Sequence, residues 1–232
     1  MGFSCVLMFS GGRDSTVASI RLANQGYRLI LVTVTSDHLE GISAVENRLI
    51  ELKRHLPQDT LWALMSDHPV TSPNLCLAQR TCLPCFLKYT SLGVIVARMF
   101  KVPSLAFGFT KYQSTWPEQT PFAVEGFRRV LASFDIALEL PVYDVVTKAE
   151  ILKELGAFGL NTLSLEQKCT RQITNQEIPG HLIESATDEW SSALFASVSS
   201  NLSLDPSFMV MKQLHEIETY GSAQQTAIRK PR

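Results

Sequence analysis

The feature that most constrains the fold of this chain is a glycine-containing turn between an apolar run and a helical pattern. The turn follows residues Phe3 to Phe9 and leads directly into a segment of helical periodicity. Its residues are Ser10, Gly11, Gly12, Arg13, Asp14, Ser15 and Thr16. Glycines tolerate positive φ and let the backbone approach an anion, while the helix presents its positive N-terminal end. The sequence therefore predicts a strand, a phosphate-binding turn and a helix in succession, with hydroxyl groups and the Arg13 guanidinium as additional donors.

Strand and helix signals alternate along the rest of the chain. Strands are predicted at 3–9, 28–34, 60–65, 104–109 and 137–140. Helices are predicted at 14–24, 43–56, 84–100, 122–134 and 147–155, with a loop at 67–80 and C-terminal helices at 187–200 and 206–220. Ser43 is the expected cap of the second helix, with Glu46 at the capping-box position. Repeated β-α units predict an α/β fold with a doubly wound parallel sheet and a small helical C-terminal extension.

In such a sheet, ligands bind beyond the carboxyl ends of the strands. The loops with the most functional side chains are all predicted on that rim. They are residues 10–16, 33–38, 66–68, 108–111 and 142–148. We expect the bound ligand to extend to Thr33, and chemistry to occur near Arg80, Gly108, Thr110 and Lys111.

Length and charge limit the organisation of the chain. The 232 residues predict one α/β domain at 1–165, a helical extension at 166–220 and a flexible tail at 221–232. A net charge of −1 does not indicate a strongly basic surface for nucleic acid, although it does not exclude a local basic patch. No stretch reaches the roughly 20 apolar residues of a membrane span, and the N-terminus lacks a secretion-signal pattern. The cytoplasm is the expected compartment.

Four of the five cysteines form a second constellation. Cys82 and Cys85 make a C-x-x-C pair at a predicted helix start, Cys76 lies shortly before them, and Cys169 follows a later helix. Four thiolates suit tetrahedral Zn²⁺, whereas three with an open position suit an iron–sulfur cluster. Separate thiols, a disulfide and a redox C-x-x-C pair are the alternatives. Cys5, within the first strand, is expected to be a core residue.

The turn resembles the S-G-G-x-D-S-[ST] signature of the PP-loop ATP pyrophosphatases. Within them, residues from about Cys5 to Cys169 most resemble the 7-cyano-7-deazaguanine synthase family of queuosine biosynthesis. The resemblance includes the Arg80 segment, the Gly108-Phe109-Thr110 turn, the Trp116-Pro117-Glu118 loop, and Pro141 followed by residues 147–151. It implies a ligase that uses ATP, with Mg²⁺, to adenylate a carboxylate or amide oxygen for attack by ammonia or another nucleophile, releasing AMP and pyrophosphate.

The resemblance also implies roles for individual residues. Lys148 would hold the phosphates, Asp14 would orient the loop or assist the metal, and Arg80 would lie near the reacting groups. The adenine of ATP would lie near Thr33. The cofactor-binding set is then Ser10, Gly11, Gly12, Arg13, Asp14, Ser15, Thr16, Thr33, Gly108 and Lys148. The cysteine spacing, and not the resemblance, gives the expected metal set, which is Cys76, Cys82, Cys85 and Cys169 for zinc. The implied substrate is a small 7-deazapurine. A homodimer is one possible assembly of the chain.

The position of the cysteines departs from that family, which carries a tight cysteine cluster near its C-terminus. This chain has no cysteine after Cys169. The upstream C-x-x-C instead resembles PP-loop tRNA thiolation enzymes, which hold an iron–sulfur cluster. A sulfur transferase is therefore the first alternative. A non-catalytic nucleotide-binding module of a larger assembly is the second.

Overall fold

The computed structural model describes residues 4–66, 83–170 and 209–218, together with residues 189, 192, 193, 195, 196, 198 and 199. A six-stranded sheet in the order β6-β5-β1-β2-β4-β8 forms its centre. The strands are β1 (Cys5–Met8), β2 (Leu29–Thr35), β4 (Leu61–Ser66), β5 (Ser104–Ala106), β6 (Ala137–Glu139) and β8 (Met209–Gln213). The first five pair in parallel, and β8 is antiparallel to β4. The predicted α/β class and the five predicted parallel strands are confirmed.

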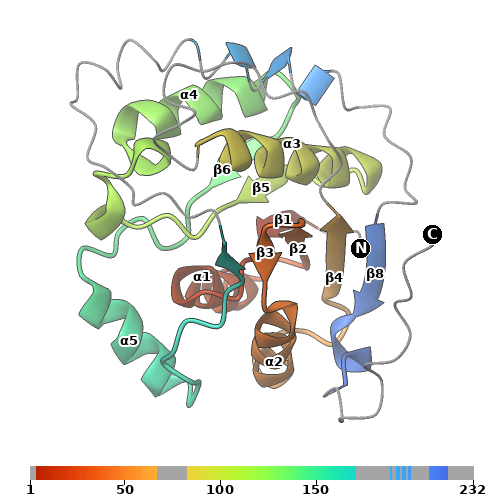
Figure 1. The fold of residues 1–232 in the computed structure, drawn as a ribbon, viewed down its shortest axis with the longest axis vertical. Helices are drawn as coiled ribbons and strands as arrows, with labels where there is room; N and C mark the ends of the chain where they lie inside the picture. The colour runs from red at the N-terminus through yellow and green to blue at the C-terminus, as the bar shows by residue number, and fades with distance from the viewer. Residues whose placement is uncertain are drawn as a thin grey trace.

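Helices cover both faces of the sheet. On one face lie α3 (Leu83–Met99) and α4 (Pro121–Ala132). On the other lie α1 (Arg13–Asn24), α2 (Ile42–Leu52) and α5 (Lys148–Ala157) (Figure 1). This is the two-sided covering expected of a doubly wound sheet. None of the helices in the described ranges has the length and hydropathy needed to cross a bilayer.

The direction in which the sheet grows reverses at β1. From β1 the chain adds β2 and β4 on one side, and then crosses over to add β5 and β6 on the other. Leu7 of β1 is paired with Leu31 of β2 and with Ala106 of β5. The carboxyl ends of β1 and β5 therefore lie side by side at the topological switch point, where sheets of this kind open a crevice for a ligand.

Apolar side chains and threonine caps explain the positions of these elements. Every residue of β1 except Met8 is buried, and β2 is buried over its first six positions, as central parallel strands require. The Thr120 hydroxyl accepts the Ala123 N–H at the start of α4. Thr147 accepts the Glu150 N–H and donates to the Glu150 carboxylate, so the capped helix predicted after residue 147 is confirmed.

Two local predictions were wrong. Helix α2 begins after Gly41, which has φ +90°, and not after Ser43, because a left-handed residue turns the chain into the helix without a side-chain cap. The helix predicted at 206–220 is instead strand β8 followed by the 3-10 turn η4 (Leu214–Glu216) over the described part of that segment. The predicted loop at 67–80 and tail at 221–232 lie outside the described residues.

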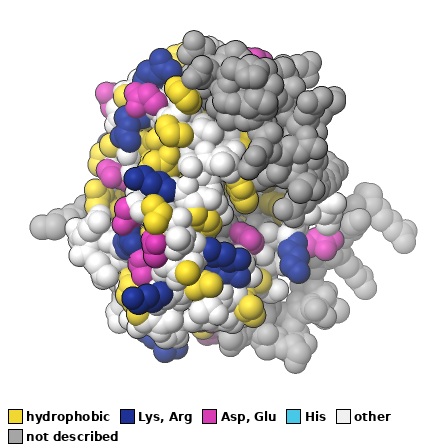
Figure 2. Space-filling model, turned by 90° about the vertical axis from the view of Figure 1, so that its left-hand side faces the viewer, with side chains coloured by type: hydrophobic (Ala, Val, Ile, Leu, Met, Phe, Trp, Pro, Cys, Tyr) yellow, Lys and Arg dark blue, Asp and Glu magenta, His cyan; other side chains and the backbone are white. Residues whose placement is uncertain are grey.

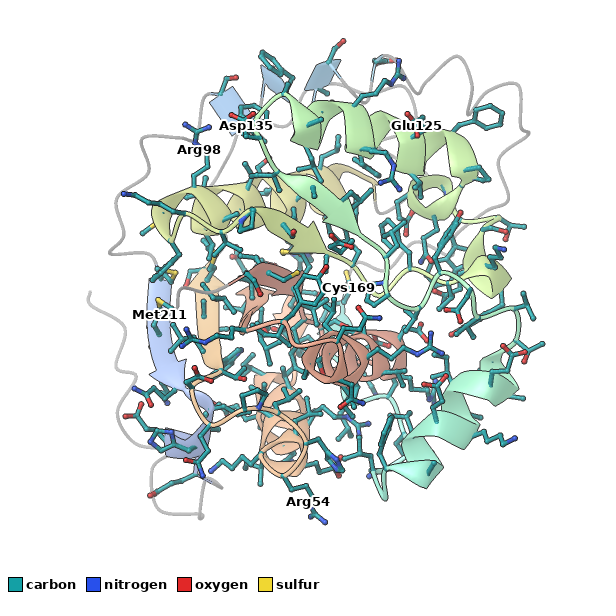
Figure 3. The ribbon with its side chains drawn as sticks, turned by 180° about the vertical axis from the view of Figure 1, so that it is seen from behind. Arg54, Arg98, Glu125, Asp135, Cys169 and Met211 are labelled. Atoms are coloured by element: carbon teal, nitrogen blue, oxygen red, sulfur yellow. The ribbon has the colours of Figure 1, made fainter. Side chains whose placement is uncertain are left out.

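Strand β8 forms because β4 offers it an edge. Its five residues pair in register with β4, from Leu61 opposite Gln213 to Met65 opposite Met209. Figure 3 shows Met211 on this outer strand. The strand covers the edge of β4, which would otherwise expose unpaired N–H and C=O groups. The seven described residues between 189 and 199 are helical, in agreement with the helix predicted at 187–200.

A buried arginine ties α2 to the segment that follows α5. The side chain of Arg48 is 0% exposed; it donates to the Glu51 carboxylate at 2.6 Å and to the Leu163 carbonyl at 2.7 Å. The Nε atom of Arg48 has no partner among the described residues, so the two bonds of its terminal nitrogens carry the compensation for burying the guanidinium and hold both partners in place.

We therefore expect Arg48→Ala to lower the free energy of unfolding by about 2–4 kcal/mol, because the change strands a carbonyl and a carboxylate and empties a buried volume. Arg128→Ala is the control, since its contact with Glu125 spans 3.7 Å between half-exposed side chains and should contribute no more than about 0.5 kcal/mol. Urea unfolding curves measure both variants. Equal losses in the two would contradict this role of Arg48.

Candidate active site

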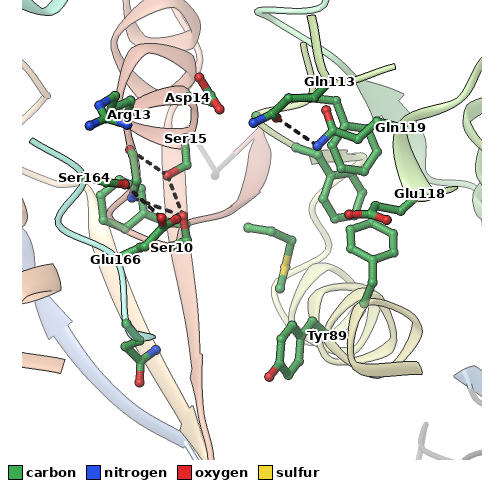
Figure 4. Close-up of a pocket in the computed structure, with 18 of the residues that line it drawn as sticks. Ser10, Arg13, Asp14, Ser15, Tyr89, Gln113, Glu118, Gln119, Ser164 and Glu166 are labelled. Atoms are coloured by element: carbon green, nitrogen blue, oxygen red, sulfur yellow. Dashed lines mark hydrogen bonds between the residues drawn. The ribbon is translucent and has the colours of Figure 1, made fainter. Parts of the chain in front are cut away.

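The turn after β1, residues 10–16, has the conformation that the sequence predicts, and it is called the cradle below. Gly11 has φ +79°, and the Gly12 N–H donates to the Ser10 hydroxyl at 3.1 Å. The Ser10 and Ser15 hydroxyl oxygens lie 3.2 Å apart at the mouth of the turn (Figure 4). Helix α1 begins at Arg13, so its unpaired N–H groups and its positive end face the same space. This geometry suits an anion.

Two of the predicted nucleotide-binding hydroxyls, those of Thr16 and Thr33, are directed elsewhere. Thr16 is fully buried and donates to the Gly12 carbonyl at 2.6 Å, so its hydroxyl closes the first turn of α1. Thr33 donates to the Phe9 carbonyl at 2.7 Å and accepts from the Trp62 indole at 3.0 Å. Thr33 still lines the cavity, but its hydroxyl is already used by the protein.

The turn after β5 packs directly on the start of α1. A Cβ at Gly108 would lie 2.7 Å from the Ser15 nitrogen and 2.8 Å from the Asp14 carbonyl carbon. Only glycine permits that approach, so the cradle and the β5 turn form one surface. The chain continues into the 3-10 turn η1 (Lys111–Gln113), whose Tyr112 hydroxyl donates to the Asp14 carboxylate at 2.7 Å.

Residues 161–170 cross the carboxyl rim beside the cradle. The Thr162 carbonyl accepts from Arg13 at 2.7 Å, and the Gln167 amide donates to the Val34 carbonyl at 2.8 Å. At its end, β7 (Lys168–Cys169) pairs antiparallel with β3 (Leu39–Glu40). A Cβ at Gly11 would lie 2.6 Å from the Leu165 carbonyl oxygen. The 161–170 segment thus fits against the glycines of the turn.

Glu166 brings a second carboxylate to the cradle. A Cβ at Gly12 would lie 2.8 Å from Glu166 Oε2, and the Ser164 hydroxyl donates to Glu166 Oε1 at 2.9 Å. Burial raises the pKa of Asp14, the hydrogen bond from Tyr112 opposes that shift, and the Glu166 charge adds to it. Two carboxylates beside a phosphate-binding turn are a donor set that suits Mg²⁺.

These elements enclose a cavity of about 730 Å³, within the range of small-molecule sites. One side is the cradle, with Ser10, Gly12, Asp14 and Ser15. Lys148 lines the same cavity from the first residue of α5. An anion in this part of the cavity would find three kinds of donor, namely backbone N–H groups, hydroxyls and the Lys148 ammonium group.

The other side of the cavity is aromatic. The rings of Phe86, Phe107 and Phe109 contact one another with centroids 5.0–5.3 Å apart. Tyr89 and Trp116 also line this side. Polar groups enter from η2 (Pro117–Gln119), which supplies Glu118 and Gln119. The cavity therefore has one side suited to an anion and another suited to a flat apolar group.

The described cysteines lie outside this cavity lining. Cys85, in the first turn of α3, lies 4.0 Å from the His38 imidazole (Sγ to Nε2), and Cys169 is paired with Leu39 in the β3–β7 ladder. Figure 3 shows Cys169 near the middle of the molecule. Within the part of the chain that the structure describes, no three potential metal ligands form a group. Cys76 and Cys82 lie outside that part.

The structure thus brings most of the predicted nucleotide-binding residues together. Ser10, Gly12, Arg13, Asp14, Ser15, Thr33, Gly108 and Lys148 all line one cavity, while Gly11 and Thr16 shape the turn from behind. Arg80 lies outside the described residues. Sequence reasoning missed Tyr112, Glu166 and Gln119. Glu118 had a sequence signal, its position in the Trp116-Pro117-Glu118 loop, but no role was predicted for it.

Strand order, helices on both faces and the glycine turn after β1 together define an α/β fold of the adenine nucleotide alpha hydrolase type. No protein-family model and no curated protein matches the sequence significantly.

Solved structures with this fold include a 4-thiouridine synthetase in complex with RNA and bound ATP, with 16% identity and a TM-score of 0.60. That similarity covers 91% of this chain and 55% of the synthetase, so the chain spans about half the length of that enzyme. The U34-tRNA thiolase NcsA of Methanococcus maripaludis, with its [4Fe-4S] cluster, has 16% identity and a TM-score of 0.52 over 88% of this chain and 73% of that one.

The contact between Gly108 and α1 generates a test. We expect Gly108→Ala to lower the free energy of unfolding by about 1–3 kcal/mol, because the added methyl group forces apart two backbone segments that touch. Gly156→Ala in α5 is the matched control; its Cβ would meet no heavy atom within 4 Å, so stability should be equal or higher. Thermal unfolding compares them. A Gly108 variant as stable as the control would refute the close packing.

Proposed function

We propose that this protein is an ATP-dependent ligase of the PP-loop type that releases AMP and pyrophosphate. The observation that carries the proposal is the S-G-G-R-D-S-T turn at the switch point, with Lys148 lining the same cavity. A cradle of N–H groups opposite an ammonium group suits the charge that develops on a leaving pyrophosphate. The ATP bound in the 4-thiouridine synthetase of the same fold supports the choice of nucleotide.

In the proposed reaction, an acceptor oxygen attacks the α-phosphate and the bond to the β-phosphate breaks. The cradle N–H groups, with the Ser10 and Ser15 hydroxyls, bind the departing pyrophosphate, and Lys148 neutralises part of its charge. Asp14 and Glu166 are the carboxylates that would hold Mg²⁺, which supplies charge neutralisation of the phosphates when bound. Tyr112 keeps the Asp14 carboxylate in place through its 2.7 Å hydrogen bond.

The acceptor we propose is the carboxylate of a 7-deazapurine, with ammonia as the nucleophile, as in the 7-cyano-7-deazaguanine synthase family. The sequence supports this through the Trp116-Pro117-Glu118 loop and residues 147–151. The cavity supports it through an aromatic side of the kind that flat heterocycles occupy. The adenylated carboxylate loses AMP when ammonia attacks its carbonyl carbon.

Sulfur transfer is the second candidate. Two enzymes of the same fold, the 4-thiouridine synthetase and the thiolase NcsA, favour it. Cys85 lies 4.0 Å from the imidazole of His38, and His38 directly precedes strand β3, whose Leu39 pairs with Cys169. Against it, the net charge of the chain is −1, and Lys and Arg are interspersed with Asp and Glu on the one face that Figure 2 shows.

The turnover test uses ATP, ammonia and 7-carboxy-7-deazaguanine, with AMP and pyrophosphate as the measured products. Lys148→Ala should lower the rate about 10²–10³-fold, the effect of removing one donor from a charge-stabilising site. Lys153→Ala, an exposed lysine on the same helix, is the control and should leave the rate unchanged. Release of ADP and phosphate would exclude the proposed bond cleavage.

Metal analysis of anaerobically purified protein separates the two candidates. About one zinc per chain without a visible chromophore supports the ligase, and a brown, iron-containing sample supports sulfur transfer. Cys85→Ser should lose the metal in either case, while Cys5→Ala, a change in the core of β1, should retain it. Protein that binds neither metal contradicts the proposed cysteine site.

A further inference from the structure

Glu118 is a buried carboxylate with an unused oxygen. The residue is 7% exposed and lies in η2, where it lines the cavity. Its Oε2 atom has no hydrogen-bond partner among the described residues. Burial raises the pKa of Glu118, and a hydrogen bond with its own backbone opposes that shift, so the unpartnered atom is Oε2 alone. A buried polar atom of this kind calls for a ligand group that donates to it.

The neighbouring polar groups are already paired with one another. The Gln119 amide donates to the Gln113 side-chain oxygen at 3.0 Å, and its own oxygen accepts the Thr110 N–H at 3.0 Å. The Tyr143 hydroxyl donates to the Gln119 backbone carbonyl at 3.1 Å. These bonds hold η2 rigidly and leave Glu118 as the residue of this turn with an acceptor to spare.

Aromatic side chains define the shape of the group that Glu118 can meet. The rings of Phe107 and Phe109 are stacked, with 14° between their planes, and Phe86 packs against both. Figure 4 shows Glu118 across the cavity from Ser10, Ser15 and Glu166. A ligand on this side is therefore separate from the phosphates, bounded by apolar rings and met by one carboxylate.

We propose that Glu118 determines the specificity of an acceptor subsite, where it accepts a hydrogen bond from an amino group or ring N–H at the edge of a planar heterocycle. The subsite deepens the function proposed above, since the heterocycle is the molecule to be adenylated. A lone metal ion fits less well, because a single carboxylate among phenylalanine rings supplies too few oxygen ligands. An apolar ring without donors would leave Oε2 unpaired and would bind more weakly.

The test compares two bases that differ in one amino group, 7-deazaguanine and 7-deazahypoxanthine, by calorimetric titration without ATP. The full chain should bind the amino base about 10–100-fold more tightly, the range for a hydrogen bond to a charged acceptor. Glu118→Gln should reduce that preference to about threefold or less. Glu125→Gln, on the outer face of α4, is the control and should keep the full preference (Figure 3).

The preference ratio distinguishes recognition from a purely structural role, because loosened packing would weaken both bases together. Glu118→Gln should also unfold at the same or a higher temperature, since it removes a buried charge. Equal binding of the two bases to the unaltered protein, a preference retained in Glu118→Gln, or no binding of either base would each overturn the proposal. AMP formation is measured separately. A protein that shows the preference without making AMP would contradict the proposed reaction and leave the role of Glu118 supported.

Discussion

The contact between the Gly108 turn and the first residues of α1 is the constraint on which the site depends. It brings the carboxyl ends of β1 and β5 together at the switch point, and it can form only where no Cβ intervenes. This contact fixes the position of the cradle. Tyr112 reaches Asp14 because η1 directly follows the Gly108 turn in the chain. On the far side, the 161–170 segment fits against Gly11 in the same way. Glycine is thus used here for close packing on both sides of the anion-binding turn.

Charge distribution divides the cavity into two environments. Near the cradle, Asp14 and Glu166 raise the local negative charge, opposed by Arg13 and Lys148. A phosphate group entering this region would need a cation to balance the carboxylates, which is consistent with Mg²⁺ as part of the proposed reaction. On the aromatic side the sole described carboxylate of the lining is Glu118, beside the rings of Phe86, Phe107 and Phe109. One end of the cavity is suited to a charged group and the other to a flat one.

The sequence predicted those parts of the structure that local patterns determine. Central strands such as β2 are continuous apolar runs, and Thr147 with Glu150 marks a helix start in any context. The cradle was predictable for the same reason, because seven adjacent residues form it. Glu166 and Tyr112 were not, since their positions depend on how separate segments pack across the rim. The error at 206–220 has the same origin: β8 is a strand because β4 offers it an edge, and this pairing overrides a local pattern that also fits a helix.

The pairing of β8 with β4 has a consequence for how the chain folds. The two strands are separated by most of the sequence, so this ladder closes a long loop, whereas β1, α1 and β2 need only near neighbours. During synthesis the half of the sheet that carries the cradle can assemble while the edge of β4 is still bare. An open edge of that kind pairs readily with other chains. The interval between the synthesis of β4 and that of β8 is therefore when the nascent protein is most exposed to aggregation.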